Sequence, residues 1–182
     1  MSSVERLEDL GLQDQEAVTL GDDAATRIRT FRLILLLAQE LRTLMDQLLR
    51  HDGLTTQQAV LTTIIDTRGE PSIKQAAAAL GTTHQNIKQL AASLERKGFI
   101  RITQDDTDAR VRRLATTPKS HSTWQRRAAA DQQHVLKWFS DLSQQQAKTL
   151  FELLLKTEAG ARAALETSRG GEDTPPPQAG GE

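Results

Sequence analysis

Two short helical patterns joined by a tight turn occupy residues 73–97, which read IKQAAAALGTTHQNIKQLAASLERK. Apolar residues share one side of each predicted helix, at Ile73, Ala77 and Leu80 in the first and at Ile87, Leu90 and Leu94 in the second. Gly81 tolerates the positive φ at which many helices end, and Thr82 or Thr83 can cap the helix that follows. The stretch therefore predicts a helix-turn-helix.

The segments on both sides extend this pattern. Two strands are predicted at residues 100–104 and 112–116, around a polar loop. Further helices are predicted from 24 to about 50, from Thr55 or Thr56 to Arg68, from Pro118 to about 141, and after Ser143. The inner face of the helix before Arg68 is assigned to Ala59, Val60, Ile64 and Ile65. This order predicts a mainly α fold with a small β-hairpin wing, in which a winged helix-turn-helix lobe joins a helical dimerisation domain.

The second helix of the helix-turn-helix presents a polar set at its N-terminal end. The candidate DNA-contacting residues there are Thr82, Thr83, His84, Gln85, Asn86, Lys88 and Gln89. Gln85 and Asn86 carry planar amides that can pair with two atoms of adenine in the major groove. The alternative interpretation is that an exposed helix face is polar in any soluble protein, but the order of the motifs favours DNA recognition.

Charge is distributed unevenly along the 182 residues, although the net charge is only −1. Residues 68–127 hold 12 Lys or Arg and five acids, a balance of +7, whereas the rest of the chain carries −8. A basic middle segment in an acidic frame is typical of a nucleic-acid surface, although a charged run can also be only a solvated face.

Three stretches resemble MarR-type regulators: LGTTHQNIKQL at 80–90, LERKGFI at 94–100 and DARVRRLATTPK at 108–119. The likeness spans about residues 24–166. It implies that Arg110 reaches the minor groove or its phosphates, with Arg112 also on the DNA side, and that Asp108 holds the shape of the wing. The chain departs from the family pattern at Ser120, where Gly is usual, and at Thr116, where the strand is usually apolar. The first 23 residues also lengthen the typical N-terminus.

The predicted domain organisation follows from these patterns. Residues 1–23 form an N-terminal arm, 53–117 the DNA-binding lobe, and 24–52 with 118–166 the helical dimerisation region. The helix from residue 24 is apolar on several sides, which requires burial against its own domain and a second chain. The low-complexity residues 167–182 are predicted to be disordered.

Other functions receive less support from the residues. The chain has no cysteine, which excludes disulfides and thiolate chemistry, and it has no P-loop, dinucleotide fingerprint, G-x-S-x-G or H-E-x-x-H motif. We therefore expect no enzyme activity and no cofactor. His121, Asp131 and His134 are the nearest approach to a metal site, and no metal is predicted. The longest apolar run, residues 33–38, is far shorter than the roughly 20 residues that span a bilayer, so a cytoplasmic protein without membrane contact is expected.

The function predicted from this resemblance is a ligand-responsive transcriptional regulator, most simply a repressor, that binds a pseudo-palindromic operator on double-stranded DNA as a homodimer. The family resemblance implies a small aromatic or phenolic ligand, but the sequence identifies no ligand-binding residues. Trp124 and Phe31 can line such a pocket or simply pack in the core, and Arg42 and His51 are weaker candidates. The alternative is a winged-helix module for protein interaction or dimerisation without specific DNA binding.

Overall fold

The computed structural model describes the backbone of residues 21–172 and the side chains of residues 21–167. The predicted N-terminal arm lies outside the described residues except at its end, where helix α3 (Asp22–Leu49) begins two residues earlier than expected. Asp22 and Asp23 occupy its first turn, where the helix dipole favours negative charge. The chain divides into two compact units, Met1–Arg126 and Arg127–Glu182.

The first unit continues from α3 through a single 3-10 turn, η1 (Arg50–Asp52), to helix α4 (Thr56–Arg68). Gly53, at φ +66°, ends the turn in the left-handed conformation that glycine adopts without strain. Asp46 near the end of α3 accepts hydrogen bonds from the Thr56 amide (2.6 Å) and hydroxyl (2.7 Å). These two bonds fix the angle at which α4 leaves α3.

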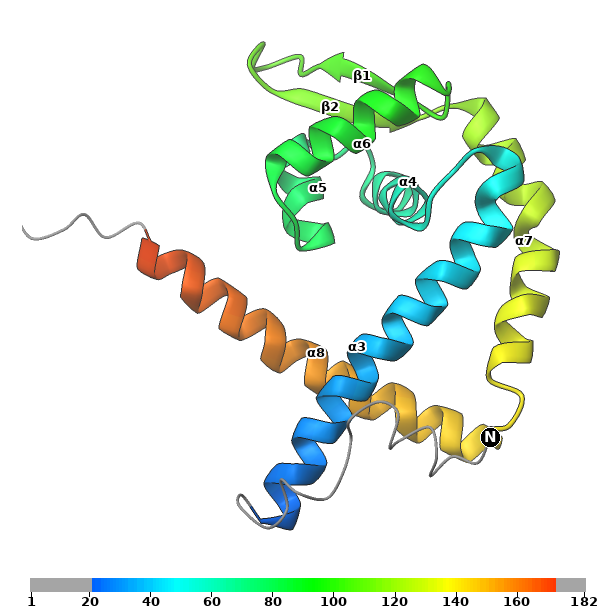
Figure 1. Cartoon of the computed structure of the whole chain (residues 1–182). Helices are drawn as coiled ribbons and strands as arrows, with labels where there is room; N and C mark the ends of the chain where they lie inside the picture. The colour runs from blue at the N-terminus through cyan, green and yellow to red at the C-terminus, as the bar shows by residue number, and fades with distance from the viewer. Residues whose placement is uncertain (1–20, 173–182) are drawn as a thin grey trace, which may run out of the picture. The chain divides into compact units, whose positions relative to one another are not determined.

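The helix-turn-helix consists of α5 (Ile73–Leu80) and α6 (His84–Arg96), as the sequence predicts (Figure 1). A capping box formed by Ser72 and Gln75 begins α5, and Gly81 ends it at φ +67°. The hydroxyl of Thr83 caps α6 by accepting a hydrogen bond from the Asn86 amide at 3.2 Å. The tight turn between α5 and α6 therefore depends on Gly81 and on the hydroxyl cap of Thr83.

Strands β1 (Ile100–Gln104) and β2 (Arg112–Thr116) form the predicted antiparallel hairpin, with Ile100 opposite Thr116 and Gln104 opposite Arg112. A further bridge pairs Ser72 with Arg113, so the hairpin also contacts the start of α5. The carboxylate of Glu95 on α6 accepts a hydrogen bond from the Ile102 amide at 2.8 Å. The hairpin is thus attached to both helices of the helix-turn-helix.

The core of this unit is aliphatic, with a single buried phenylalanine. Its buried side chains include Leu49, Leu61, Ile65, Ala77, Ile87, Ala91, Leu94, Phe99, Ile100 and Leu114. The predicted inner faces of α5 and α6 are confirmed. One assignment in α4 was wrong, because Val60 is 41% exposed while Leu61 and Ile65 point into the core. The buried positions Gln58, Leu61, Thr62 and Ile65 follow the helical period, and Val60 lies outside that stripe.

Helix α7 (Pro118–Trp138) begins in the first unit and ends three residues before the predicted end. In the second unit, α8 (Gln144–Glu172) starts after Ser143, whose hydroxyl accepts a hydrogen bond from the Gln146 amide. Residues 167–172 belong to this helix, so the prediction of a disordered tail from residue 167 was wrong at its start. Residues 173–182 lie outside the described part of the chain.

Candidate nucleic-acid interface

The N-terminal half of α6 carries the predicted base-reading residues. Thr83, His84, Gln85, Lys88 and Gln89 are exposed, whereas Ile87 and Leu94 on the opposite side are fully buried. Burial of one side fixes the rotation of the helix about its own axis, because turning it would expose the apolar side chains. The polar side is therefore held facing solvent.

Thr82 and Asn86 differ from their exposed neighbours. Both are half-buried, and the side-chain amide of Asn86 donates a hydrogen bond to the Thr82 hydroxyl at 3.0 Å. Asn86 also contributes its backbone amide to the Thr83 cap. Sequence reasoning treated Gln85 and Asn86 as equivalent base readers, but the structure gives Asn86 a part in holding the turn and leaves Gln85 exposed.

The loop of the hairpin, residues 105–111, presents Arg110 at the surface. Asp108 accepts a hydrogen bond from the Arg110 backbone amide through its side chain (2.9 Å) and another from the Val111 amide through its carbonyl (2.9 Å). Asp108 therefore makes the turn that carries Arg110, in keeping with the shape-holding role predicted for it. Arg112, at the start of β2, is also exposed.

Asp105 is the centre of the loop, and sequence reasoning gave it no role. Its Oδ1 accepts hydrogen bonds from the Thr107 amide (3.0 Å), the Thr107 hydroxyl (2.6 Å) and the Asp108 amide (3.1 Å), while Oδ2 pairs with Arg113 Nε at 2.5 Å. The Thr107 hydroxyl and, next, Arg113 hold the pKa of Asp105 well below its ordinary value. An aspartate that opens a polar loop is typical of an Asx-turn, which was the available signal.

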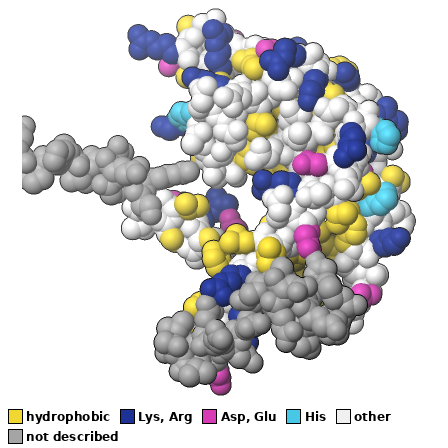
Figure 2. Space-filling view, viewed as in Figure 1, with side chains coloured by type: hydrophobic (Ala, Val, Ile, Leu, Met, Phe, Trp, Pro, Cys, Tyr) yellow, Lys and Arg dark blue, Asp and Glu magenta, His cyan; other side chains and the backbone are white. Residues whose placement is uncertain are grey.

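Arg113 has a different role from Arg110 and Arg112, although all three fall in one basic run. Besides its ion pair with Asp105, its guanidinium lies 3.4 Å from the Glu70 carbonyl and 3.4 Å from Gln75 Oε1. Arg113 thus joins the hairpin to the start of α5. Figure 2 shows Lys and Arg side chains around the lobe that contains α4, α5, α6 and the hairpin.

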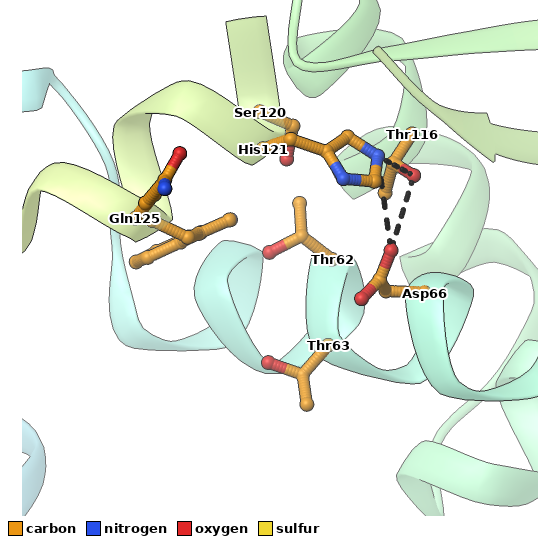
Figure 3. Close-up of a pocket in the computed structure, with 8 residues that line it drawn as sticks. Thr62, Thr63, Asp66, Thr116, Ser120, His121 and Gln125 are labelled. Carbon is orange, nitrogen blue, oxygen red and sulfur yellow. Dashed lines mark hydrogen bonds and ion pairs between the residues drawn. The ribbon is translucent and has the colours of Figure 1, made fainter. Parts of the chain in front are cut away.

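A pocket of about 410 Å³ lies within the first unit, between α4, the end of β2 and the first turns of α7 (Figure 3). The residues that matter for its chemistry are Thr62, Asp66, Thr116, Ser120, His121 and Trp124. Trp124 packs against the core, as one interpretation expects, and it also lines this pocket, whose role as a ligand site stays a prediction. Phe31 is 60% exposed and lies outside the pocket lining.

Among the described residues, no group of three or more His, Asp or Glu side chains is arranged to hold a metal ion. Asp131 forms an ion pair with Arg127 at 2.8 Å, and His121 lies 3.8 Å from Asp66. No helix in the described range 21–172 is long and apolar enough to cross a membrane.

The capped helix-turn-helix with a basic hairpin attached to it defines a winged helix-turn-helix protein. Residues 52–111, which hold the helix-turn-helix, strand β1 and the hairpin loop, match the MarR family. The matched segment is 60 of the 182 residues, and the winged helix-turn-helix fold is shared with solved structures of MarR-family proteins. No curated protein sequence matches the chain.

Several solved structures share the fold. A MarR protein from Peptoclostridium difficile has a TM-score of 0.71 at 16% identity, over 76% of this chain and 91% of its own. S. aureus MepR, solved with DNA, has a TM-score of 0.64 at 20% identity, over 71% of this chain and 95% of its own. Streptococcus pneumoniae FabT, also solved with DNA, has a TM-score of 0.62 at 17% identity, over 76% of this chain and 98% of its own.

Proposed function

We propose that this protein is a transcription regulator that binds double-stranded DNA in a sequence-specific manner. The observation that carries the proposal is the polar N-terminal half of α6, which is exposed while the opposite side of the same helix is buried. A helix held in this way can enter the major groove with Gln85, His84 and Thr83 toward base edges. The solved structures of MepR and FabT with DNA, which share the fold, support the same assignment.

The hairpin supplies the charge for contact with the DNA backbone. Arg110 and Arg112 are exposed, while Arg113 is engaged at the base of the loop. We assign Arg110 to the minor groove or its phosphates, and Lys88 on α6 to an adjacent phosphate. Phosphate contacts position a protein on the duplex and contacts with base edges supply specificity, so α6 and the hairpin have separate tasks.

We further propose that the protein acts as a homodimer on a pseudo-palindromic operator. Helix α3 leaves Phe31, Leu35 and Leu37 exposed, and α8 by itself leaves Phe151 and Leu153 exposed. Apolar side chains of this size on long helices are typical of surfaces that a second subunit covers. A two-fold dimer would place two α6 helices roughly 34–36 Å apart, one turn of DNA, and would read two half-sites.

The proposed regulation is repression that a small molecule relieves. The pocket between α4 and α7 is the candidate ligand site. A ligand there can act on DNA binding because the start of α7 is attached to the end of α6, the proposed recognition helix. Lys119 donates a hydrogen bond to the Lys97 carbonyl (2.6 Å), and the Thr117 hydroxyl donates to the Gly98 carbonyl (2.7 Å). A ligand that shifts this turn would therefore shift the end of α6.

The test is fluorescence anisotropy of the full chain on DNA from its own upstream region and on random duplex, each at two salt concentrations. Specific regulation predicts saturable, salt-dependent binding that favours the upstream DNA by about a thousandfold. Equal, weak binding to both duplexes would contradict sequence-specific recognition of that region. A lack of binding at low salt would favour the protein-interaction module.

A further inference from the structure

The pocket between α4 and α7 has an unusual balance of hydrogen-bonding groups. Asp66 brings the formal negative charge, and no Lys or Arg belongs to the described residues that line the pocket. His121 is the one lining residue that becomes a cation on protonation. The pocket therefore favours a ligand with positive charge, since an anion would meet the Asp66 carboxylate without a permanent cation nearby.

The contacts of Asp66 leave part of its carboxylate available. Thr116 Oγ1 lies 3.4 Å from Asp66 Oδ1 and 2.9 Å from His121 Nε2, and His121 Nε2 is 3.8 Å from the same Oδ1 (Figure 3). Both contacts of the Asp66 carboxylate involve Oδ1, and among the described residues no recorded contact involves Oδ2. A ligand ammonium can approach Oδ2 without displacing Thr116 or His121.

The hydroxyl groups of α4 also present acceptors rather than donors. Thr62 and Thr63 both direct their hydroxyl protons to the Ala59 carbonyl, at 2.7 and 3.2 Å. Their oxygen lone pairs are what remains for a ligand. Together with Asp66, they give the α4 side of the pocket three acceptor groups, which suits a ligand that carries several N–H donors.

The α7 side contributes two buried polar atoms without a hydrogen bond among the described residues, Ser120 Oγ and Trp124 Nε1. Ser120 is only 1% exposed, and such unsatisfied buried groups are few in native structures. The indole N–H is a donor only, so a ligand that pairs with it must offer an acceptor. Ser120 and Thr116 are also two positions at which the sequence departs from the pattern of the MarR-type resemblance.

We propose that this pocket binds a small molecule that carries a protonated amine and one hydrogen-bond acceptor. The amine pairs with Asp66 and the hydroxyl oxygens of α4, while the acceptor meets Trp124 Nε1 or Ser120 Oγ after a small adjustment of the first turn of α7. The amine replaces the simple phenol that the family resemblance implies. The role of this ligand as an effector rests on the proposed function, whereas its binding does not.

The test measures binding without DNA by three matched probes: 2-phenoxyethylamine, 2-phenoxyethanol and phenoxyacetate. They share the ring and the ether oxygen and differ in charge. Isothermal titration of the full chain gives the affinities, and a Trp138→Phe chain leaves Trp124 as the remaining tryptophan, whose emission reports on the pocket. Asp66→Asn removes the charge at nearly constant shape, and Asp106→Asn makes the same change on the exposed hairpin loop as a control.

The amine should bind best and the carboxylate worst. Asp66→Asn should weaken amine binding roughly tenfold, the effect of one charge-assisted hydrogen bond, and Asp106→Asn should leave it unchanged. Phenoxyacetate binding as tightly as the amine, equal effects of both substitutions, or no binding of any probe would overturn the proposal. If the amine binds as expected but upstream DNA does not, the proposed function fails while the ligand site stands.

Discussion

Gln58 offers a sharp test of how the recognition helix is held, because its buried amide joins three parts of the first unit. Its Oε1 accepts hydrogen bonds from the Thr55 amide (3.2 Å) and from Lys97 Nζ (2.9 Å), and its Nε2 donates to Ser93 Oγ (3.0 Å). Ser93 lies on α6 and Lys97 directly follows that helix. Gln58, only 5% exposed, therefore links the start of α4 to the end of α6.

Gln58→Ala removes all three hydrogen bonds and opens a small cavity. A net contribution of about 1 kcal/mol for each bond gives an expected loss of roughly 2–3 kcal/mol in the free energy of unfolding. For a chain of this size, about 2–4 °C per kcal/mol converts this loss into a fall in Tm of roughly 5–10 °C. Lys97 retains its bond to the Gly53 carbonyl (2.6 Å), so the loss should not exceed this range.

Urea unfolding followed by circular dichroism measures the loss, with Gln57→Ala as the matched control. Gln57 is the same residue type one position earlier and is exposed, so its substitution should change stability by less than about 0.5 kcal/mol. A double-mutant cycle with Ser93→Ala should give a coupling free energy of about 0.5–1.5 kcal/mol. A loss for Gln58→Ala no larger than for Gln57→Ala, or a coupling of zero, would refute the inference that this amide joins α4 to α6.

Three further predictions concern the DNA interface and the hairpin. Arg110→Ala should weaken binding to all duplexes and reduce the slope of log affinity against log salt concentration by about one unit per lost phosphate contact. Arg162→Ala on α8, the control, should change neither. An unchanged slope for Arg110→Ala would contradict the assignment of Arg110 to the DNA backbone. Gln85→Ala should reduce the preference for upstream over random DNA roughly tenfold while random binding stays constant, as paired anisotropy titrations would show. Because the folded pKa of Asp105 is lowered, its contribution to the hairpin is present above its ordinary pKa near 3.8 and is lost only as the pH falls through the lower folded value. The hydrogen-exchange protection of the Thr107 and Asp108 amides, which donate to Asp105, should therefore persist from pH 7 to about 4, and in Asp105→Asn it should already differ at pH 7.

The helix boundaries were predictable because the sequence encodes them locally. Thr55, Ser72 and Thr83 each cap the helix that follows through a hydrogen bond to an amide three residues later. Gly81 ends α5 in the left-handed conformation, which residues with a side chain disfavour. The buried faces of α5 and α6 followed from the helical period alone. Val60 was misassigned because Val60 and Leu61 are adjacent and both apolar, and only packing against α5 and β2 decides which one is buried.

The candidate site was predictable to a lesser degree, since several of its parts depend on contacts between distant residues. The capping contact of Asn86 is local and could be predicted from the sequence. The contacts of Arg113 with Asp105, Glu70 and Gln75 could not, because they form only when the hairpin lies against the start of α5. The pocket combines α4 with α7, more than 50 positions apart along the sequence. Periodicity and spacing carry no information on such pairs.

The local caps have a consequence for the order in which the chain acquires structure. Helices α4, α5 and α6 and the hairpin contact one another mainly as neighbours in sequence, which is typical of chains that fold quickly. The Gln58–Ser93 bond closes a loop of 35 residues, while the Arg126–Asp52 ion pair (2.7 Å) closes one of 74. During synthesis from the N-terminus, the helix-turn-helix can therefore form as soon as its residues emerge, and α7 joins it last. A newly made chain would acquire α6 and the hairpin beside it before helices α7 and α8 exist.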